Sequence, residues 1–320
     1  MVSKPTSYKM TLTVTFGNYN DHDEANATIA SIRATAHCPV DVIVIDDGSP
    51  TPFACTDPMT RVVRCDRRIG SGPTRALGAE LAKDGWVLST DSHMRFVPGW
   101  TQAIQQISDG PKDTVWCGSC LGLAPGRMDL ADAQGCYNGA TMHFAGTNPR
   151  NAQQVQVMEG KWTSDKPGDH YDLAMIMGAL YLSHKSWIQH VKPWSWLKMW
   201  GSEEPSLGLR TWALGGSCKM LKGLQAGHQF RTKSFHSAPS ACNLYNKLRI
   251  AHSVMPYVAY HTVLRESARE YLNSGDRETA ARWLAEDNHM MVVDKAFMEE
   301  NTKLSFEGYL ERFSLPKFWV

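Results

Sequence analysis

Two continuous apolar runs most restrict what this chain can fold into. Residues 40–50 read VDVIVIDDGSP and residues 85–91 read GWVLSTD, so each run is apolar on consecutive positions and then ends in carboxylates. Such runs are typical of strands that are buried on both faces in the centre of a parallel sheet. Segments with helical periodicity at 23–36 and 72–84 alternate with these strands and with another at 11–16. The order predicts a doubly wound α/β sheet that binds ligands at the carboxyl ends of its strands.

Composition limits the class of protein. The 320 residues carry 33 Lys and Arg against 32 Asp and Glu, a formal net charge of +1, which gives no overall sign of a polyanionic partner. The N-terminus lacks the apolar segment of a signal peptide, and the longest apolar run, 173–182, is shorter than the roughly 20 residues of a membrane span. The eight cysteines are scattered and are expected to be reduced. We therefore expect a soluble protein of the cytoplasm, including that of a virus-infected host, with no membrane contact.

A zinc site is one reading of the cysteines. Cys117 and Cys120 have the spacing of a ligand pair, and Cys136 and His143 could complete a set of four. Small buried thiols beside a turn would give the same pattern. The chain lacks the second closely spaced pair of a typical zinc motif, which favours the buried thiols.

Asp46 and Asp47 end the run at 40–50. At a strand end, a carboxylate can accept the imide proton of uracil or the hydroxyls of a ribose, and an Asx-type turn would use these residues equally well. A Rossmann dinucleotide site is a poor fit, because Arg75 stands where the loop that begins at Gly70 needs its third glycine.

Asp91 and His93 follow the second run and are separated by one residue, so on an extended backbone they point the same way. A carboxylate with a neutral imidazole suits Mn²⁺ or Mg²⁺. Two side chains leave coordination positions for substrate phosphates, as in sites that activate a diphosphate. By itself the pair could equally close a turn.

Later segments supply further candidates. Trp200, Glu203 and Glu204 precede a predicted helix. His228 offers a third metal ligand, and Arg231 offers a cation for a departing diphosphate. Each has a simpler explanation, because acidic residues favour any helix N-terminus and a single histidine is usually structural. From about residue 243 the chain is helical by period, and its alternating charges predict a solvated helix face on an appendage.

In this order the segments resemble the glycosyltransferase-A (GT-A) fold, and specifically the polypeptide N-acetylgalactosaminyltransferases. The resemblance runs from about residue 11 to 232, with a poorly matched gap between about 105 and 170. It rests on the segments TFGN, VIVIDDGS, DRRIGSGPTRALGA, TDSHMRFVPGW, MGALYLSHKSW, MWGSEEPSLGLRTWALGG and GHQFR. Ser202 stands where that family has a second glycine, and Pro205 breaks the usual continuation.

The resemblance implies an organisation and a site. It implies a doubly wound mixed GT-A sheet over residues 1–240, with the UDP-sugar half at about 1–100 and the acceptor half at about 101–240, followed by a helical region at 241–320. The metal ligands would be Asp91, His93 and His228. The residues at the reaction centre would be Glu203, Trp200 and Arg231. The nucleotide-sugar contacts would be Thr15, Phe16, Asp46, Asp47, Arg68, Gly72, Ser92, Gly178 and Ala179.

The implied reaction is metal-dependent transfer of a hexose or N-acetylhexosamine from a UDP-sugar to a hydroxyl, with retention of configuration. Mn²⁺ or Mg²⁺ would stabilise the negative charge that grows on UDP. Because an unsecreted enzyme would not meet secretory cargo, we favour a hydroxymethylated pyrimidine in viral DNA as acceptor. Candidate DNA contacts lie at 161–168, 192–198 and 245–249, where a solvated rim with core tryptophans is the simpler reading. The alternatives are a Ser or Thr of a polypeptide, a glycan, lipid or small molecule, and a non-catalytic module that binds nucleotide sugars.

Overall fold

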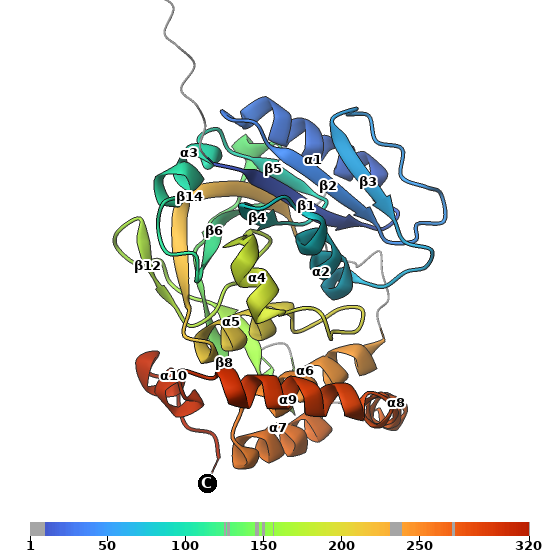
Figure 1. The fold of residues 1–320 in the computed structure, drawn as a ribbon, viewed down its shortest axis with the longest axis vertical. Coiled ribbons are helices and arrows are strands. Elements are labelled where there is room, and N and C mark those ends of the chain that lie inside the picture. The colour runs from blue at the N-terminus through green and yellow to red at the C-terminus, as the bar shows by residue number, and fades with distance from the viewer. Residues whose placement is uncertain are drawn as a thin grey trace, which may run out of the picture.

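The structure is a computed structural model that describes residues 10–124, 126, 129–144, 147–148, 151–155, 157–230, 239–270 and 273–319, without the side chains of 147–148 and 151–155. Within these residues the centre is a ten-stranded mixed sheet with the main order β12-β14-β6-β13-β4-β1-β2-β3 (Figure 1). β5 pairs with β14, and β7 pairs with β6. The strands of this sheet are β1 Leu12–Asn18, β2 Asp41–Asp46, β3 Thr60–Arg64, β4 Trp86–Ser89, β5 Met94–Phe96, β6 Thr114–Leu123, β7 Cys136–Tyr137, β12 His170–Leu173, β13 Tyr181–His184 and β14 Ser217–Gln229.

Two short strand pairs and a series of helices complete the fold. The pairs are β8 Ala140–His143 with β11 Glu159–Trp162, and β9 Thr147–Asn148 with β10 Asn151–Val155. The helices are α1 His22–Thr35, α2 Ser71–Leu81, α3 Trp100–Ile107, η1 Leu130–Asp132, α4 Lys185–Val191, α5 Glu203–Ala213, α6 Ser240–Val254, α7 Tyr257–Glu270, α8 Ser274–Glu286, α9 Asn288–Asn301 and α10 Phe306–Arg312. None of the described helices is both long and apolar enough to cross a membrane.

The apolar runs occupy the sheet centre as predicted. β1 is parallel to both β2 and β4, and the register sets Val14 opposite Val42 and Phe16 opposite Val44. In β2 the four consecutive residues 42–45 are each 4% exposed or less, so both faces of the strand are buried, which explains why apolar residues occur on consecutive positions. The antiparallel strand β13 between β4 and β6 makes the sheet mixed. The α/β fold with a mixed sheet and a helical C-terminal region is therefore confirmed.

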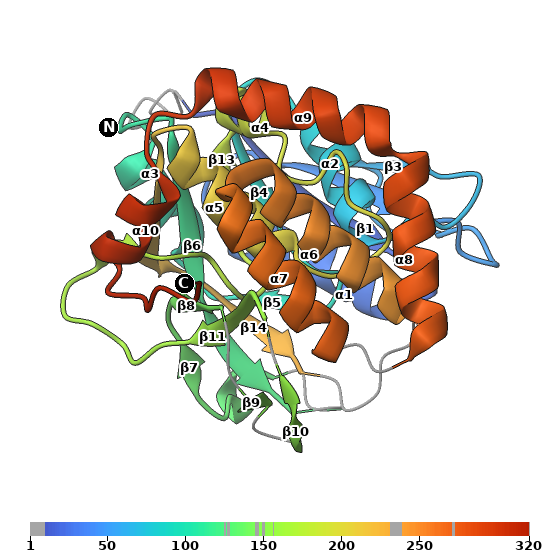
Figure 2. The ribbon, with the colours of Figure 1, turned by 90° about the horizontal axis from the view of Figure 1, so that it is seen from below.

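The C-terminal helices share a core with the sheet. Figures 1 and 2 show α6–α10 grouped on one side of the molecule, below the sheet in the view of Figure 1. Leu248 of α6 and Tyr309 of α10 belong to the same buried apolar cluster as Val115 of β6 and Met220 of β14. The Tyr309 hydroxyl also donates to the Ala174 carbonyl at 2.8 Å. The C-terminal helices therefore pack against the sheet and share its hydrophobic core.

The expectation of a solvated polar face is wrong for α6. Asn246, Lys247 and Arg249 are each 3% exposed or less. Lys247 forms ion pairs with Glu159 of β11 and Glu270 of α7. The charge of Lys247, which the sequence pattern placed on a solvated face, therefore joins α6 to β11 and α7 inside the protein.

One buried ion pair ties α5 to the C-terminal helices, and its loss should be costly. Arg210 and Asp294 are 3% and 5% exposed, and Arg210 Nη1 lies 2.9 Å from Asp294 Oδ1. Asp294→Ala would leave a buried guanidinium without its carboxylate, so we expect a loss of about 3–5 kcal/mol in unfolding free energy, measured by urea denaturation. Glu299→Ala removes a more exposed pair with Lys295 on the same helix and should change stability by less than about 1 kcal/mol. Equal effects of the two variants would contradict the role assigned to the buried pair.

Candidate functional site

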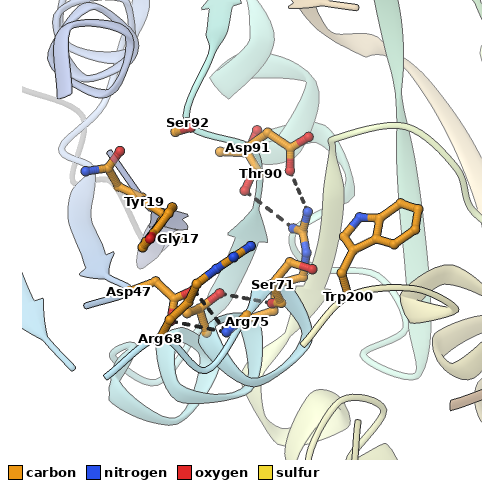
Figure 3. A pocket seen from close by; sticks show the side chains of 13 residues that line it. Gly17, Tyr19, Asp47, Arg68, Ser71, Arg75, Thr90, Asp91, Ser92 and Trp200 are labelled. Carbon is orange, nitrogen blue, oxygen red and sulfur yellow. Dashed lines mark hydrogen bonds and ion pairs between the residues drawn. The ribbon is translucent and has the colours of Figure 1, made fainter. Parts of the chain in front are cut away.

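The carboxyl ends of three neighbouring strands form the first wall of the site. The parallel register sets Asn18 at the end of β1 opposite Asp46 at the end of β2, and the backbone N–H of Thr90 after β4 donates to Thr15 of β1. The segments that follow these strands line a cavity of about 300 Å³, which we call the nucleotide cavity after the ligand expected there from the sequence (Figure 3). Its lining residues are Gly17, Asn18, Tyr19, Asp47, Arg68, Gly70, Ser71, Thr74, Arg75, Thr90, Asp91, Ser92 and Trp200.

Asp91, His93 and His228 form the one group of three or more potential metal ligands among the described residues. Their ligand atoms all lie within 4.8 Å of one another. The antiparallel pairing of β14 with β5 sets His228 opposite Met94, and this register brings an imidazole from residue 228 beside His93. The His228 Nδ1 atom is buried and has no hydrogen-bond partner, so the ring retains an unused donor atom. One carboxylate and two imidazoles fit Mn²⁺, and the site therefore suits the metal expected from the sequence.

Asp21, at the start of α1, orients this group and was missed from the sequence. Its Oδ2 atom accepts a hydrogen bond from Ser92 Oγ at 3.1 Å and lies 3.5 Å from His93 Nδ1. A carboxylate on one ring nitrogen directs the other nitrogen toward a metal. In the sequence, Asp21 is visible only as an acidic residue before a helix, so the contact with Ser92 and His93 had no local signal.

Arg75 of α2 is the second residue that sequence reasoning did not assign to the site. Its guanidinium lies 2.6 Å from Asp91 Oδ1, donates to Ser89 Oγ at 2.9 Å and stacks over the Tyr181 ring at 4.7 Å. Burial by itself raises the pKa of Asp91, but Arg75 and then His228 outweigh it and hold that pKa well below its usual range. Asp91 is therefore ionised and ready to bind a cation.

The two adjacent aspartates have separate tasks. Asp46 is 1% exposed and accepts hydrogen bonds from the backbone N–H groups of Ser49 and Phe53 and from Arg64, and it does not line the cavity. Asp47 does line the cavity and accepts from the N–H groups of residues 69 and 70. Burial raises the pKa of Asp47. Asp46 thus stabilises the turn, which agrees with the Asx-type interpretation of the sequence. Asp47 faces the cavity.

Of the other nucleotide-sugar contacts predicted in the first half of the chain, some line the cavity and others are buried beside it. Thr15 and Phe16 are each 1% exposed inside β1, and the cavity is lined by the next residues along the strand. Arg68 lines the cavity, with its guanidinium 4.5 Å from the Tyr19 ring centroid, and Ser92 lines it as well. Gly72 is absent from the lining and packs on Leu197.

A second cavity, of about 330 Å³, adjoins the first and shares Ser71, Arg75, Asp91 and Trp200 with it. We call it the acceptor-side cavity, after the acceptor half of the domain expected from the sequence. Its other lining residues are Glu159, Gly160, Trp162, Met175, Met177, Gly178, Tyr181, Gly201, Ser202, Glu203, Glu204, Pro205, His228, Phe230 and Asn243. The predicted contact Ala179 is 1% exposed and lies in the core beside the lining residue Gly178.

Glu203 and Trp200 both reach this second cavity. Trp200 is 59% exposed and lines both cavities, and Figure 3 shows its side chain among those of the first cavity. Glu203 is 6% exposed, accepts from the Ser71 hydroxyl and accepts from the Gly201 N–H at 2.9 Å. Its carboxylate is therefore held rigidly. Arg231, the third residue expected at the reaction centre, lies outside the described residues.

Glu204 is half-buried beside Glu203. It accepts a hydrogen bond from the Tyr181 hydroxyl at 2.6 Å. Burial and the neighbouring Glu203 raise the pKa of Glu204 to about 7. The acceptor-side cavity thus contains a carboxyl group that titrates near neutral pH.

The four candidate zinc ligands do not come together among the described residues. Cys117 and Cys120 are buried, while Cys136 is exposed. Burial raises the pKa of the Cys117 thiol to about 12, which disfavours the thiolate that zinc requires. The reading of small buried thiols fits Cys117 and Cys120.

Comparisons with known proteins show which proteins this chain is similar to. Residues 14–122 match the family described as Glycosyl transferase family 2. Polypeptide N-acetylgalactosaminyltransferase 16 of Mus musculus is 26% identical over 252 residues, which are 73% of this chain and 43% of that protein. Polypeptide N-acetylgalactosaminyltransferase 14 of Homo sapiens is 24% identical over 267 residues, which are 78% of this chain and 47% of that protein. The chain thus spans less than half the length of these relatives.

Solved structures extend the likeness to the fold. The crystal structure of GalNAc-T7 with UDP, GalNAc and Mn²⁺ matches with a TM-score of 0.72 at 18% identity, covering 97% of this chain and 57% of that one. Residues 1–349 of S. aureus TarS in complex with UDP-GlcNAc match with a TM-score of 0.53 at 12% identity, covering 96% and 93%. The resemblance inferred from the sequence and the GT-A fold are therefore confirmed.

Removal of Asp21 should weaken metal binding without removing a ligand. Asp21→Ala leaves Asp91, His93 and His228 in place but takes away the carboxylate beside His93 Nδ1, so we expect Mn²⁺ affinity to fall about 10- to 100-fold. Isothermal titration calorimetry measures this change. Glu24→Gln is the matched control on the same helix, because Glu24 pairs with Arg95 instead. An affinity equal to that of the wild type would refute the orienting role.

The raised pKa of Glu204 should appear in the pH dependence of stability. A carboxyl group with a folded pKa of about 7 against an ordinary value near 4.3 favours folding while it is neutral. That contribution is lost as pH rises from about 4.3 through about 7. Glu204→Gln stays neutral, so we expect it to be more stable than the wild type at pH 8 by at least about 1 kcal/mol, and little changed relative to it near pH 4. Urea denaturation at both pH values provides the measurement, and Glu286→Gln, at an exposed position of α8, should show no such difference.

Proposed function

We propose that this chain is a metal-dependent glycosyltransferase that moves a sugar from a UDP-sugar to a hydroxyl group, with retention of configuration. The observation that carries the proposal is the group of Asp91, His93 and His228, of which Asp91 lines both cavities and His228 lines the second. A diphosphate between the two cavities would lie beside these ligands. The relatives named above are polypeptide N-acetylgalactosaminyltransferases, which supports transfer of a sugar to a hydroxyl group.

In this proposal the first cavity binds UDP. Asp47 and Arg68 line it together with Tyr19, so it offers a carboxylate, a guanidinium and an aromatic ring. When bound, Mn²⁺ or Mg²⁺ neutralises negative charge on the diphosphate and acts as a Lewis acid. Arg75 keeps Asp91 ionised for this purpose. Arg231 remains a proposed partner of the departing diphosphate.

The second cavity would hold the sugar and the acceptor. Glu203, fixed by Ser71 and by the Gly201 N–H, would orient sugar or acceptor hydroxyls, and we do not assign it as a covalent nucleophile. Trp200 would cover the boundary between sugar and diphosphate and exclude water there. The Gly178 backbone, with φ of +85°, lets the chain approach the Trp162 ring closely at the cavity wall.

Several basic and aromatic residues of the candidate DNA-contact segments are buried or paired within the protein. Trp194 is 1% exposed, Lys198 pairs with Asp287 at 2.8 Å, and Lys247 is fully buried. Glu159, together with Glu203 and Glu204, also lines the acceptor-side cavity, and carboxylates there oppose a phosphate backbone. We therefore favour a Ser or Thr hydroxyl of a polypeptide over a hydroxymethylated pyrimidine. The cytoplasmic location expected from the sequence stays a prediction.

Mass spectrometry of two acceptors tests the proposal. The full chain is incubated with Mn²⁺, a panel of UDP-hexoses and UDP-N-acetylhexosamines, and either a Ser/Thr-rich peptide pool or duplex DNA containing hydroxymethylpyrimidine. We expect a sugar mass on the peptide, no mass on the DNA, and loss of transfer in Asp91→Ala, because that variant lacks the ionised ligand. Glu24→Gln serves as the control that retains transfer.

The other results are equally informative. A sugar mass on the nucleoside with the peptides untouched would overturn the polypeptide acceptor and keep the transferase. UDP binding with equal, negligible transfer in the wild type and in Asp91→Ala would instead indicate a non-catalytic module. Failure of the wild type to bind either Mn²⁺ or UDP would overturn the proposal as a whole.

A further inference from the structure

One face of α6 is directed at the candidate site. Asn243, Asn246 and Lys247 have the i, i+3, i+4 spacing that puts side chains on the same face of a helix. Asn243 lines the acceptor-side cavity and accepts a hydrogen bond from Ser202 Oγ at 2.8 Å. Lys247 holds Glu159, which lines the same cavity. The first C-terminal helix therefore contributes to the site, although the sequence predicts only an appendage here.

Asn246 makes the most extensive of these contacts. Its side chain is fully buried, and its Oδ1 atom accepts from the Lys198 N–H at 2.8 Å. Its Nδ2 atom donates to the carbonyls of Lys198 at 2.9 Å, Gly201 at 2.8 Å and Trp200 at 3.4 Å. One amide thus contacts the backbone of three residues in the loop 198–202, which has no helix or strand of its own.

The loop 198–202 has an unfavourable backbone that needs such support. Met199, Gly201 and Ser202 have φ values of +50°, +106° and +65°. For the two residues that are not glycine this conformation is uncommon and costs energy, so it persists only where surrounding contacts impose it. At Gly201 a side chain is excluded as well, because a Cβ atom would lie 2.6 Å from Asn243 Oδ1.

Three groups of the site depend on where this loop lies. Trp200 belongs to the loop and lines both cavities. The Gly201 N–H holds the Glu203 carboxylate. The Met199 carbonyl accepts from the Gly72 N–H at 3.1 Å, which joins the loop to the start of α2 near Arg75. A shift of the loop would therefore move Trp200 and Glu203 relative to the metal ligands.

We propose that Asn246 is a positioning residue, which fixes the loop 198–202 so that Trp200 and Glu203 face the sugar of the donor. The inference rests on the proposed function for its catalytic consequence, while the fixing of the loop itself is independent of any substrate. Asn246 contacts the loop backbone and does not line either cavity, so it acts through Trp200 and Glu203. Binding of UDP should depend on it little, because Asp47 and Arg68 lie on other segments.

Hydrogen–deuterium exchange of the full chain without ligand tests the positioning. In Asn246→Ala we expect the amides of residues 198–203 to exchange at least about tenfold faster, with exchange in β1, β2 and β4 unchanged. Asn246→Ser keeps a small, uncharged donor and acceptor at this buried position and should give a smaller increase, and it replaces the alanine variant if that one fails to fold. Ser253→Ala is the matched control, because it removes a buried hydrogen bond between α6 and Arg210 at 2.9 Å without touching the loop. Unchanged exchange at 198–203, or an equal increase in Ser253→Ala, would overturn the positioning role.

Kinetics and binding test the consequence. With the acceptor and donor found above, we expect Asn246→Ala to lose about 100-fold in kcat, as small misplacements of catalytic groups commonly do, while its Kd for UDP with Mn²⁺ stays close to that of the wild type. Ser253→Ala should retain its kcat. A kcat equal to that of the wild type, or parallel losses in UDP binding and kcat, would overturn the assignment. If the wild type itself shows no transfer, the proposed function fails, and the exchange experiment alone then decides whether Asn246 fixes the loop.

Discussion

The candidate site depends on one buried cation, the guanidinium of Arg75. Four groups that can carry a negative charge surround it. Asp91 contacts the guanidinium directly, the Tyr181 ring stacks against it, and Glu203 and Glu204 act at longer range. Burial alone lowers the pKa of Arg75, but Asp91 and the other acids outweigh this and raise it. Because buried carboxylates without a partner are costly, this arrangement permits several of them to stay close together in a site that also accommodates a metal ion and a diphosphate.

The C-terminal helices take part in the same arrangement. Arg210 and Asp294 join α5 to α9, Lys247 joins β11 to α6 and α7, and Asn246 joins α6 to the loop before α5. Each connection uses a polar side chain that is buried and paired, which gives a defined geometry at the expense of solvation. The sheet supplies the ligands of the site, and these helices fix the segment that faces them.

Much of the fold could be predicted from the sequence, because local patterns specify it. The apolar runs mark β2 and β4, and the order of strands and helices gives the doubly wound sheet. The residue at which a strand stops is less well specified. The lining of the nucleotide cavity begins after Phe16, at Gly17, and of two adjacent carboxylates it is Asp47 that faces the cavity. Successive side chains point to opposite sides of a strand. An error of one residue therefore assigns a core residue to the site, or a site residue to the core.

Other site residues could not be predicted, since their roles come from contacts between distant parts of the chain. Asp21 meets Ser92 across 71 positions, and Asn246 meets Lys198 across 48. In the sequence, Asp21 is visible only as an acidic residue before a helix, and Asn246 only as a polar residue within one. The polar pattern of α6 was also ambiguous, because paired buried charges and solvated charges have the same spacing in a sequence.

The long strand β14 has a consequence for how the site forms. It pairs with β12, β6 and β5, its register with β6 shifts between Leu221 and Gln225, and it ends at the site with His228, whose contact with Asp91 spans 137 positions. Such a contact forms only after a large loop of chain has closed, so it belongs to the slow, non-local part of folding. Asp91 and His93 are synthesised well before His228, and without β14 the site has only two of its three potential metal ligands. Affinity for a metal ion is therefore acquired late, when the last strand enters the sheet, and metal binding would report that the sheet is complete.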